Sequence, residues 1–297
     1  MATHRPHWQD YTSAIVSGFL GDWLEQRGNR LAVDMQFIHN RQPLTAVPAD
    51  ASDTVFLLIH GLTELESIWD YPHQPGSHYG TELADACNGT PLLMRYNTGR
   101  PIYRNGLDLS EQLETLLSQW PVPVKRLVLV GHSMGGLVIR SACHYGQLAQ
   151  HRWIESVCSC VYLGSPHQGS WLARLAHHGS ALMQQMPRDY LRVVGDVLEL
   201  RSEGIRNLTH GEIIEQQQAI PPLLASAKHF AASGLLIKQR ENPINWLFGD
   251  ALVQEHSARC TNLPGWSLQD HACFPGIDHI RLTHHPDVAQ QLRSWLL

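Results

Sequence analysis

The sequence is poor in charged residues and has no long apolar run. Charged residues make up 16% of the 297, and the net charge of -5 comes with neither a basic stripe nor an acidic tail. Electrostatics therefore gives no reason to expect a nucleic-acid partner. No apolar run approaches the roughly 18 residues of a spanning helix, and the first residues lack a signal-peptide pattern. We expect a cytoplasmic protein without stable membrane insertion, and the sequence leaves its oligomeric state open.

Cysteine is also scarce, with six residues scattered along the chain. Cys158 and Cys160 would point to the same face of one strand, so we expect reduced thiols in packing roles. The 19 histidines invite a metal hypothesis. Neither the segment "YPHQPGSHYG" nor the pairs His177-His178 and His284-His285 has the spacing of a known metal site. Structural or surface histidines are the expectation, with no metal and no cofactor.

Apolar residues make up 43% of the chain, enough for a sizeable core. Short apolar segments alternate with amphipathic ones, which predicts an α/β fold with a mostly parallel central sheet and helices on both faces. The expected strands are "DTVFLLIHG", "PLLMRYN", "VKRLVLVG", "ESVCSCVYLGSP", "KHFAASGLLI" and "SLQDHACF". The expected helices between and after them are "HYGTELADAC", "DLSEQLETLLSQW", "MGGLVIRSACHYGQLA" and "DVAQQLRSWLL".

The chain divides into a core and two additions. Residues 1–50 form an N-terminal extension, with an amphipathic helix at 10–27 and a strand pair in "RLAVDMQFIHNRQPL". The core covers 51–167 and 229–297. Residues 168–228 are predicted to be helical throughout, as a lid over the carboxyl ends of the strands. Leu182 and Met183 would line an apolar pocket beneath this lid, although these helices could instead extend the core.

The segment Gly131-His132-Ser133-Met134-Gly135 matches G-x-S-x-G between an expected strand and an expected helix. A serine in that context projects its hydroxyl above the sheet as a nucleophile. Glycines allow the close backbone approach that the turn needs. The N–H of Met134 would donate to an oxyanion at the start of the helix. The alternative is a glycine-rich turn with an incidental serine.

A nucleophilic serine needs a base and an acid, which follow it in chain order in this type of hydrolase. Asp250 comes after one of the last strands and His279 after the other, and these are our choices. Other acids and bases nearby remain alternatives. They are Asp270, Asp278, His271, His284 and His285.

The loop after the first core strand, "HGLTE", should supply the second oxyanion donor, the N–H of Leu62. His60 and Gly61 in this loop, with Leu182 and Met183, are expected near the substrate. We interpret the ring of His60 as holding the loop rather than as a second base, and the ring of His132 as lying beneath the turn. Arg95, just before "YNTGRPIYRNG", and Arg100 and Arg104 within it suggest a solvated loop, with an anion site as the alternative.

Five segments of the chain resemble α/β-hydrolase lipases and esterases, particularly a bacterial branch similar to GPI inositol-deacylase-like and triacylglycerol-lipase-like enzymes. They are "VFLLIHGL", "LVLVGHSMGGLVIR", "VYLGSPHQGS", "GDALVQEHSA" and "GIDHIRLTHHPDVAQQLRSWL". The resemblance implies hydrolysis of carboxylic esters, with Ser133 as nucleophile, Asp250 as acid and His279 as base. The chain differs at Ala251 and Gln254, where the family often has Gly and Pro.

Two other functions are compatible with these residues. An acyltransferase or a thioesterase would use the same serine chemistry. A catalytically inactive member of the fold would serve as a binding protein, because a fold does not determine a function.

Overall fold

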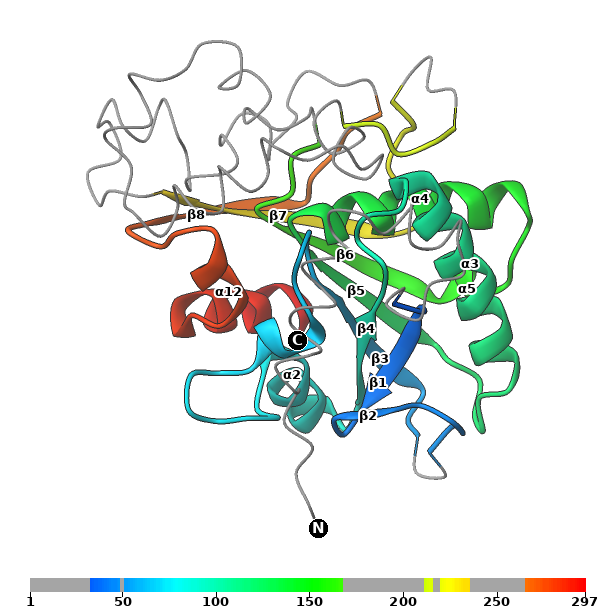
Figure 1. The fold of residues 1–297 in the computed structure, drawn as a ribbon, viewed down its shortest axis with the longest axis horizontal. Helices are drawn as coiled ribbons and strands as arrows, with labels where there is room; N and C mark the ends of the chain where they lie inside the picture. Colours follow the sequence, from blue (N-terminus) through cyan, green and yellow to red (C-terminus); the bar gives the residue numbers. More distant parts are fainter. Residues whose placement is uncertain (1–32, 49–50, 168–210, 216–219, 236–264) are drawn as a thin grey trace.

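The computed structural model describes residues 33–48, 51–167, 211–215, 220–235 and 265–297 (Figure 1). The expected N-terminal helix, the lid residues Leu182 and Met183, and the expected acid Asp250 lie outside these ranges.

The described residues form one eight-stranded sheet in the order β2-β1-β4-β3-β5-β6-β7-β8. The six strands from β3 to β8 are parallel, and β1 pairs antiparallel with both β2 and β4. The strands are β1 (Gln36–His39), β2 (Gln42–Pro43), β3 (Thr54–Ile59), β4 (Thr90–Arg95), β5 (Arg126–His132), β6 (Val157–Leu163), β7 (Lys228–Leu235) and β8 (Asp270–Pro275).

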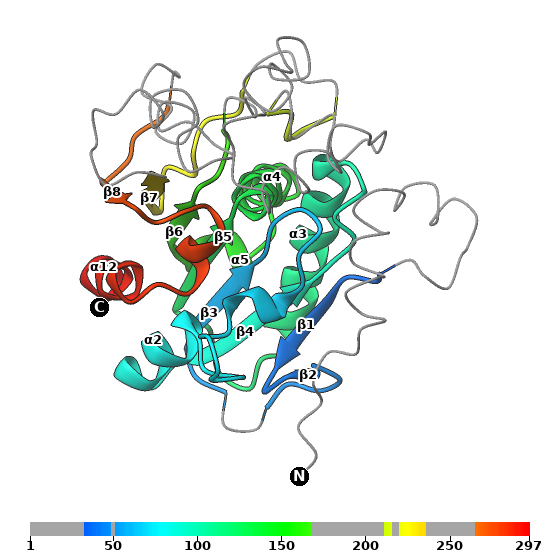
Figure 2. The ribbon, with the colours of Figure 1, turned by 60° about the vertical axis from the view of Figure 1, so that its left-hand side comes forward.

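Helices cover both faces of the sheet, as the sequence predicts (Figure 2). One face carries α3 (Ile102–Ser118), α4 (Met134–Leu148) and α5 (Trp153–Ser156). The other carries α2 (Tyr79–Cys87) and α12 (Pro286–Leu296). Two short 3-10 helices, η1 (Glu66–Trp69) and η2 (Ile280–Thr283), complete the described elements.

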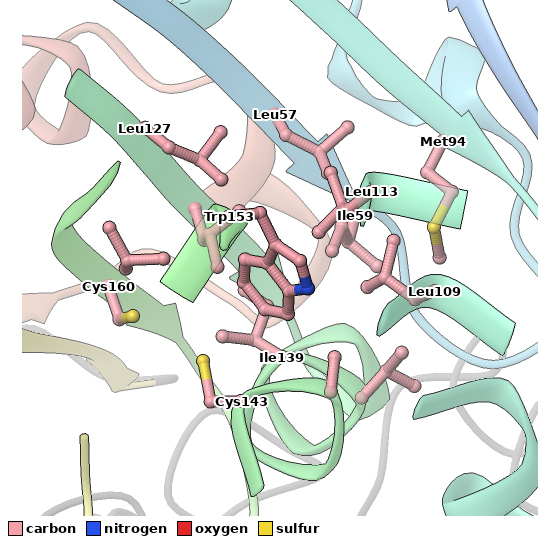
Figure 3. Close-up of a cluster of buried hydrophobic side chains, with 14 of the residues drawn as sticks. Leu57, Ile59, Met94, Leu109, Leu113, Leu127, Ile139, Cys143, Trp153 and Cys160 are labelled. Atoms are coloured by element: carbon pink, nitrogen blue, oxygen red, sulfur yellow. The ribbon is translucent and has the colours of Figure 1, made fainter. Parts of the chain in front are cut away.

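The strand β3 shows how the sheet separates two apolar cores. Every residue of β3 is buried. Leu57 and Ile59 face the core beneath α3, α4 and α5, whereas Phe56 and Leu58 face the core beneath α2 and α12. Successive side chains of a strand point to opposite faces, so a strand covered on both sides must be apolar at every position. Figure 3 shows the first core, with Trp153 packed among Leu57, Leu127 and Ile139.

The structure corrects two predictions about helices. Helix α3 begins at Ile102, so Arg104 lies on a helix and not in a solvated loop. Arg95 ends β4 and forms an ion pair with Glu66, and Arg100 pairs with Asp108. Because both guanidinium groups have carboxylate partners, nothing here supports a separate anion site.

The end of the predicted lid also differs from the prediction. Residues 211–215 and 220–227 contain no helix, contrary to the prediction for 168–228. Pro221 and Pro222 lack the N–H groups that a helix would need there. Leu223 and Leu224 are buried in the core beside α4, and Arg140 of α4 donates to the carbonyl of Pro221 at 2.8 Å. This part of the segment therefore packs against the core.

The β1–β2 hairpin turns at Asn40 and Arg41, both with positive φ. Five cysteines are described and all five are free thiols, as predicted. Within the described ranges no three His, Cys, Asp or Glu side chains are grouped so as to hold a metal ion. Of the described helices, none has the length and apolar character needed to cross a bilayer.

Candidate active site

Ser133 lies in the sharp turn between β5 and α4 that the sequence predicts. Its φ of 51° and ψ of −122° are unusual for a residue with a side chain, and such strain is common at functional sites. Its N–H donates to the carbonyl of Leu163 at 2.8 Å, which holds the turn against β6. Ser133 precedes α4, yet its side chain makes no capping hydrogen bond with the helix. The hydroxyl is therefore not used to stabilise the helix.

Glycines on both sides of Ser133 are required by the space available. A Cβ atom on Gly131 would lie 2.5 Å from the backbone nitrogen of Gly136. A Cβ atom on Gly135 would lie 2.3 Å from the carbonyl oxygen of Ile59. Both distances are far below van der Waals contact, so only glycine fits at either position. The spacing G-x-S-x-G is thus explained by close packing of Gly131 against the first turn of α4 and of Gly135 against the end of β3.

The loop after β3 passes directly beside Ser133, because Ile59 and Gly131 are partners in neighbouring parallel strands. Three N–H groups of this loop have acceptors. Gly61 donates to Glu64 Oε2 at 2.6 Å, Thr63 to Thr98 Oγ1 at 3.1 Å and Glu64 to the carbonyl of Gly61 at 3.4 Å. In the part of the chain that the structure describes, the N–H of Leu62 donates to no acceptor.

Among the described residues, two peptide N–H groups near the turn thus have no hydrogen-bond acceptor. Leu62 contributes one from the loop after β3. Met134 is the first residue of α4, where an N–H has no acceptor inside the helix. Both were predicted as oxyanion donors, and this arrangement is compatible with that role.

His60 is fully buried and holds the loop, as its sequence context suggested. Its Nδ1 donates to the carbonyl of Gly61 at 2.9 Å, and its ring stacks on Tyr96 with centroids 4.7 Å apart. The hydroxyl of Tyr96 donates to the carbonyl of His60 at 2.8 Å. Burial lowers the pKa of His60, so the ring is neutral at pH 7.

His279 follows β8 and lies against the turn. It is buried, and its ring centroid is 4.5 Å from that of His132, the residue before Ser133. Within the described residues no hydrogen bond joins the hydroxyl of Ser133 to the ring of His279. Catalytic contacts of this kind often shorten only when substrate binds.

The other candidate bases are engaged elsewhere. His271 lies in β8, where its Nε2 is hydrogen-bonded to the hydroxyl of Ser233 at 3.2 Å. His284 Nδ1 is 2.9 Å from the hydroxyl of Thr283. His285 caps α12 by accepting from the N–H of Asp287. Of the four histidines, His279 is the one beside the turn.

The carboxylates of the two alternative acids have other hydrogen-bond partners. Asp270 is the first residue of β8, at the amino end of the strand, whereas Ser133 follows the carboxyl end of the parallel strand β5. Its carboxylate accepts from Trp295 Nε1 at 2.8 Å and from the N–H of His271. Asp278 accepts from the N–H of Arg281 at 3.0 Å. The expected acid, Asp250, lies outside the described residues.

One feature of the site escaped the sequence interpretation, a buried pair of Glu64 and His132. His132 Nδ1 lies 3.0 Å from Glu64 Oε2. Burial raises the pKa of Glu64, but several contacts, led by the charge and hydrogen bond of His132, outweigh burial together and bring this pKa below its usual value. A carboxylate three residues after Gly61 was the available signal, but only the fold brings it to His132.

Comparisons with known proteins agree with this description. A family model described as "PGAP1-like alpha/beta domain" matches residues 103–196. The mature form of the Bacillus licheniformis lipase BlEst2 superposes with a TM-score of 0.55 and 20% sequence identity, covering 86% of this chain and 97% of that chain. Its propeptide form gives a TM-score of 0.54 and 18% identity, covering 88% of this chain and 53% of that chain. No curated protein sequence matches this chain.

The parallel sheet, its two helical layers and the sharp strand-to-helix turn after β5 define an α/β-hydrolase fold. Within that fold class, the matched segment is similar to the PGAP1-like alpha/beta domain, and it contains α4 together with the turn residue Ser133.

Proposed function

We propose that the protein is a serine hydrolase that cleaves carboxylic esters, with Ser133 as its nucleophile. The observation that carries this proposal is the strained turn at Ser133, packed against Gly61 and followed directly by the N-terminus of α4. A lipase with the same overall fold, BlEst2, supports ester hydrolysis as the reaction class. His279 is proposed as base and Asp250 as acid.

The reaction would proceed in two steps. Ser133 Oγ attacks the carbonyl carbon of the ester while His279 takes its proton, and the N–H groups of Leu62 and Met134 stabilise the oxyanion. Collapse of the tetrahedral intermediate breaks the ester C–O bond, and His279 returns the proton to the leaving alcohol. Water then attacks the acyl-enzyme with the same base, which releases the carboxylic acid and regenerates Ser133.

The identity of the ester stays a prediction. Leu182 and Met183 are proposed to line an apolar acyl site under a lid formed by residues 168–210, which favours medium acyl chains over acetyl. Each methylene buried there contributes about 0.8 kcal/mol. A thioesterase or an acyltransferase would use the same machinery, so thioesters and added alcohols belong in the substrate panel.

The proposal is tested with p-nitrophenyl esters of increasing chain length and with a fluorophosphonate that labels reactive serines. Ser133→Ala should abolish labelling and lower kcat by about three orders of magnitude or more. Ser110→Ala is a matched control, because Ser110 is a buried serine like Ser133 and lies beside a histidine, His151, to which its hydroxyl is hydrogen-bonded at 3.0 Å. Wild-type turnover in Ser133→Ala would reject the proposal, whereas an inactive wild type would favour a binding protein.

A further inference from the structure

The imidazole of His132 connects two segments that lie far apart in sequence. Its Nδ1 is 3.0 Å from Oε2 of Glu64, in the loop after β3. Its Nε2 is 3.0 Å from the backbone carbonyl oxygen of His279, in the loop after β8. The ring is fully buried and the carboxylate is 10% exposed. One ring therefore contacts the loop of the proposed oxyanion donor and the loop of the proposed base.

Both contacts of the ring are with acceptors. A carbonyl oxygen cannot donate, so Nε2 must carry a proton. Glu64 Oε2 already accepts the N–H of Gly61 at 2.6 Å, which favours an ionised carboxylate. An ionised carboxylate can only accept a hydrogen bond, so Nδ1 of His132 must carry a proton as well. The hydrogen-bond pattern is therefore satisfied by a doubly protonated His132 paired with a carboxylate, a neutral pair overall.

We propose that Glu64 and His132 are positioning residues that hold three parts of the site in register: the Gly61–Glu64 loop, the turn at Ser133 and the backbone of His279. This inference rests on the proposed function. Neither side chain is assigned contact with the substrate. His132 acts on the base through the His279 carbonyl, and Glu64 acts on the donor loop through the Gly61 N–H.

The close packing around Gly61 makes the position of its loop sensitive to the loss of either Glu64 or His132. Gly61 is packed between Ser133 and Glu64, since a Cβ atom on it would lie 2.8 Å from Ser133 Cβ and 3.0 Å from Glu64 Oε2. Loss of the carboxylate would free the Gly61 N–H and let this loop move relative to Ser133. Misplacement of reacting groups by about 1 Å can lower a rate about 100-fold.

The test separates positioning from stability with three variants, Glu64→Met, His132→Phe and the double variant. His132→Phe leaves a buried carboxylate without its cationic partner, which is strongly destabilising. The double variant replaces the whole pair by apolar groups of similar volume, and such replacements often restore stability. The thermal midpoint of the double variant should therefore exceed that of His132→Phe.

Catalysis should not recover in the same way. We expect kcat on a p-nitrophenyl ester to fall about 10- to 100-fold in both single variants and to stay equally low in the double variant, with KM changed little. Glu66→Gln is the matched control. Glu66 forms a neighbouring, partly buried ion pair with Arg95, so this variant should lose stability but retain kcat.

Three outcomes would overturn the inference. The first is a kcat that recovers together with stability in the double variant. The second is a decrease of kcat in the double variant that equals the product of the two single decreases. The effects of independent residues add in free energy and therefore multiply in kcat. The third is wild-type kcat in Glu64→Met. If His132→Phe does not fold, Glu64→Asp, which withdraws the carboxylate by one methylene, must show the loss of kcat or the inference fails. A wild type without Ser133-dependent turnover would instead reject the proposed function.

Discussion

A Cβ atom built on Gly61 would lie 2.8 Å from the Cβ atom of Ser133. The backbone of the loop after β3 therefore runs in direct contact with the proposed nucleophile, and this contact needs a residue without a side chain.

Gly61→Ala should lower activity more than stability. The added methyl group must push either the loop or Ser133 away, which moves Leu62 relative to the oxyanion and should lower kcat about 10- to 100-fold. Gly135→Ala is the comparison, because its methyl group would meet the backbone of Ile59 at 2.3 Å and should prevent folding. Steady-state kinetics and thermal unfolding of both variants check this, and an unchanged kcat in Gly61→Ala would contradict it.

Ser133→Gly should be more stable than Ser133→Ala. Position 133 has φ 51° and ψ −122°, which strains any residue with a Cβ atom. Glycine relieves that strain, although part of the gain is lost to its greater freedom in the unfolded chain. We expect a difference of about 1 kcal/mol, measured by urea unfolding. Equal stability of the two variants would show that the turn is not strained.

The acid assignment predicts different effects for two aspartates. Asp250→Asn should reduce kcat strongly, because the amide no longer stabilises the imidazolium of His279. Asp270→Asn should leave kcat unchanged, because it alters only the hydrogen bonds of Asp270 with Trp295 and His271 at the amino end of β8. Kinetics of the two variants at constant pH distinguish them. The reverse result would place the acid at 270.

Stability should depend on the protonation of His78 between about pH 6.5 and 4. Burial, with a smaller contribution from the charge of Arg41, lowers the pKa of His78 to about 4. The neutral ring caps α2 by accepting from the N–H of Thr81 at 3.3 Å. Because the folded pKa is below the unfolded value, this stability is complete above pH 6.5 and is lost as pH falls towards 4.

His78→Asn keeps a capping side chain without a group that titrates in this range. The difference in unfolding free energy between pH 7 and pH 5 should be smaller in the variant than in the wild type by about 2 kcal/mol. Urea titrations at both pH values measure it. An identical loss in both proteins would mean that folding does not lower the pKa of His78.

Local patterns were sufficient to predict most of the described elements. Buried parallel strands must be largely apolar on both faces, so β3, β5 and β6 appear as mostly apolar segments in the sequence. The turn at Ser133 was equally visible, because the demand for glycine at positions 131 and 135 comes from atoms only a few residues away or on the neighbouring strand. The boundary of α3 was missed because Gly106 resembled a loop residue, whereas it lies inside a helix packed closely on Ser141 of α4.

The sequence by itself thus determined the alternation of strands and helices, the turn at Ser133 and the histidine that follows the last strand. These depend on periodicity and on spacing within short segments. Only the tertiary structure decided that residues 220–227 pack on α4 without forming a helix, and that Glu64, His132 and the carbonyl of His279 meet. The order of strands brings the loops after β3, β5 and β8 to one edge of the sheet. Glu64 and His132 are 68 positions apart in the sequence, and His132 and His279 are 147 positions apart, so no local pattern encodes these contacts.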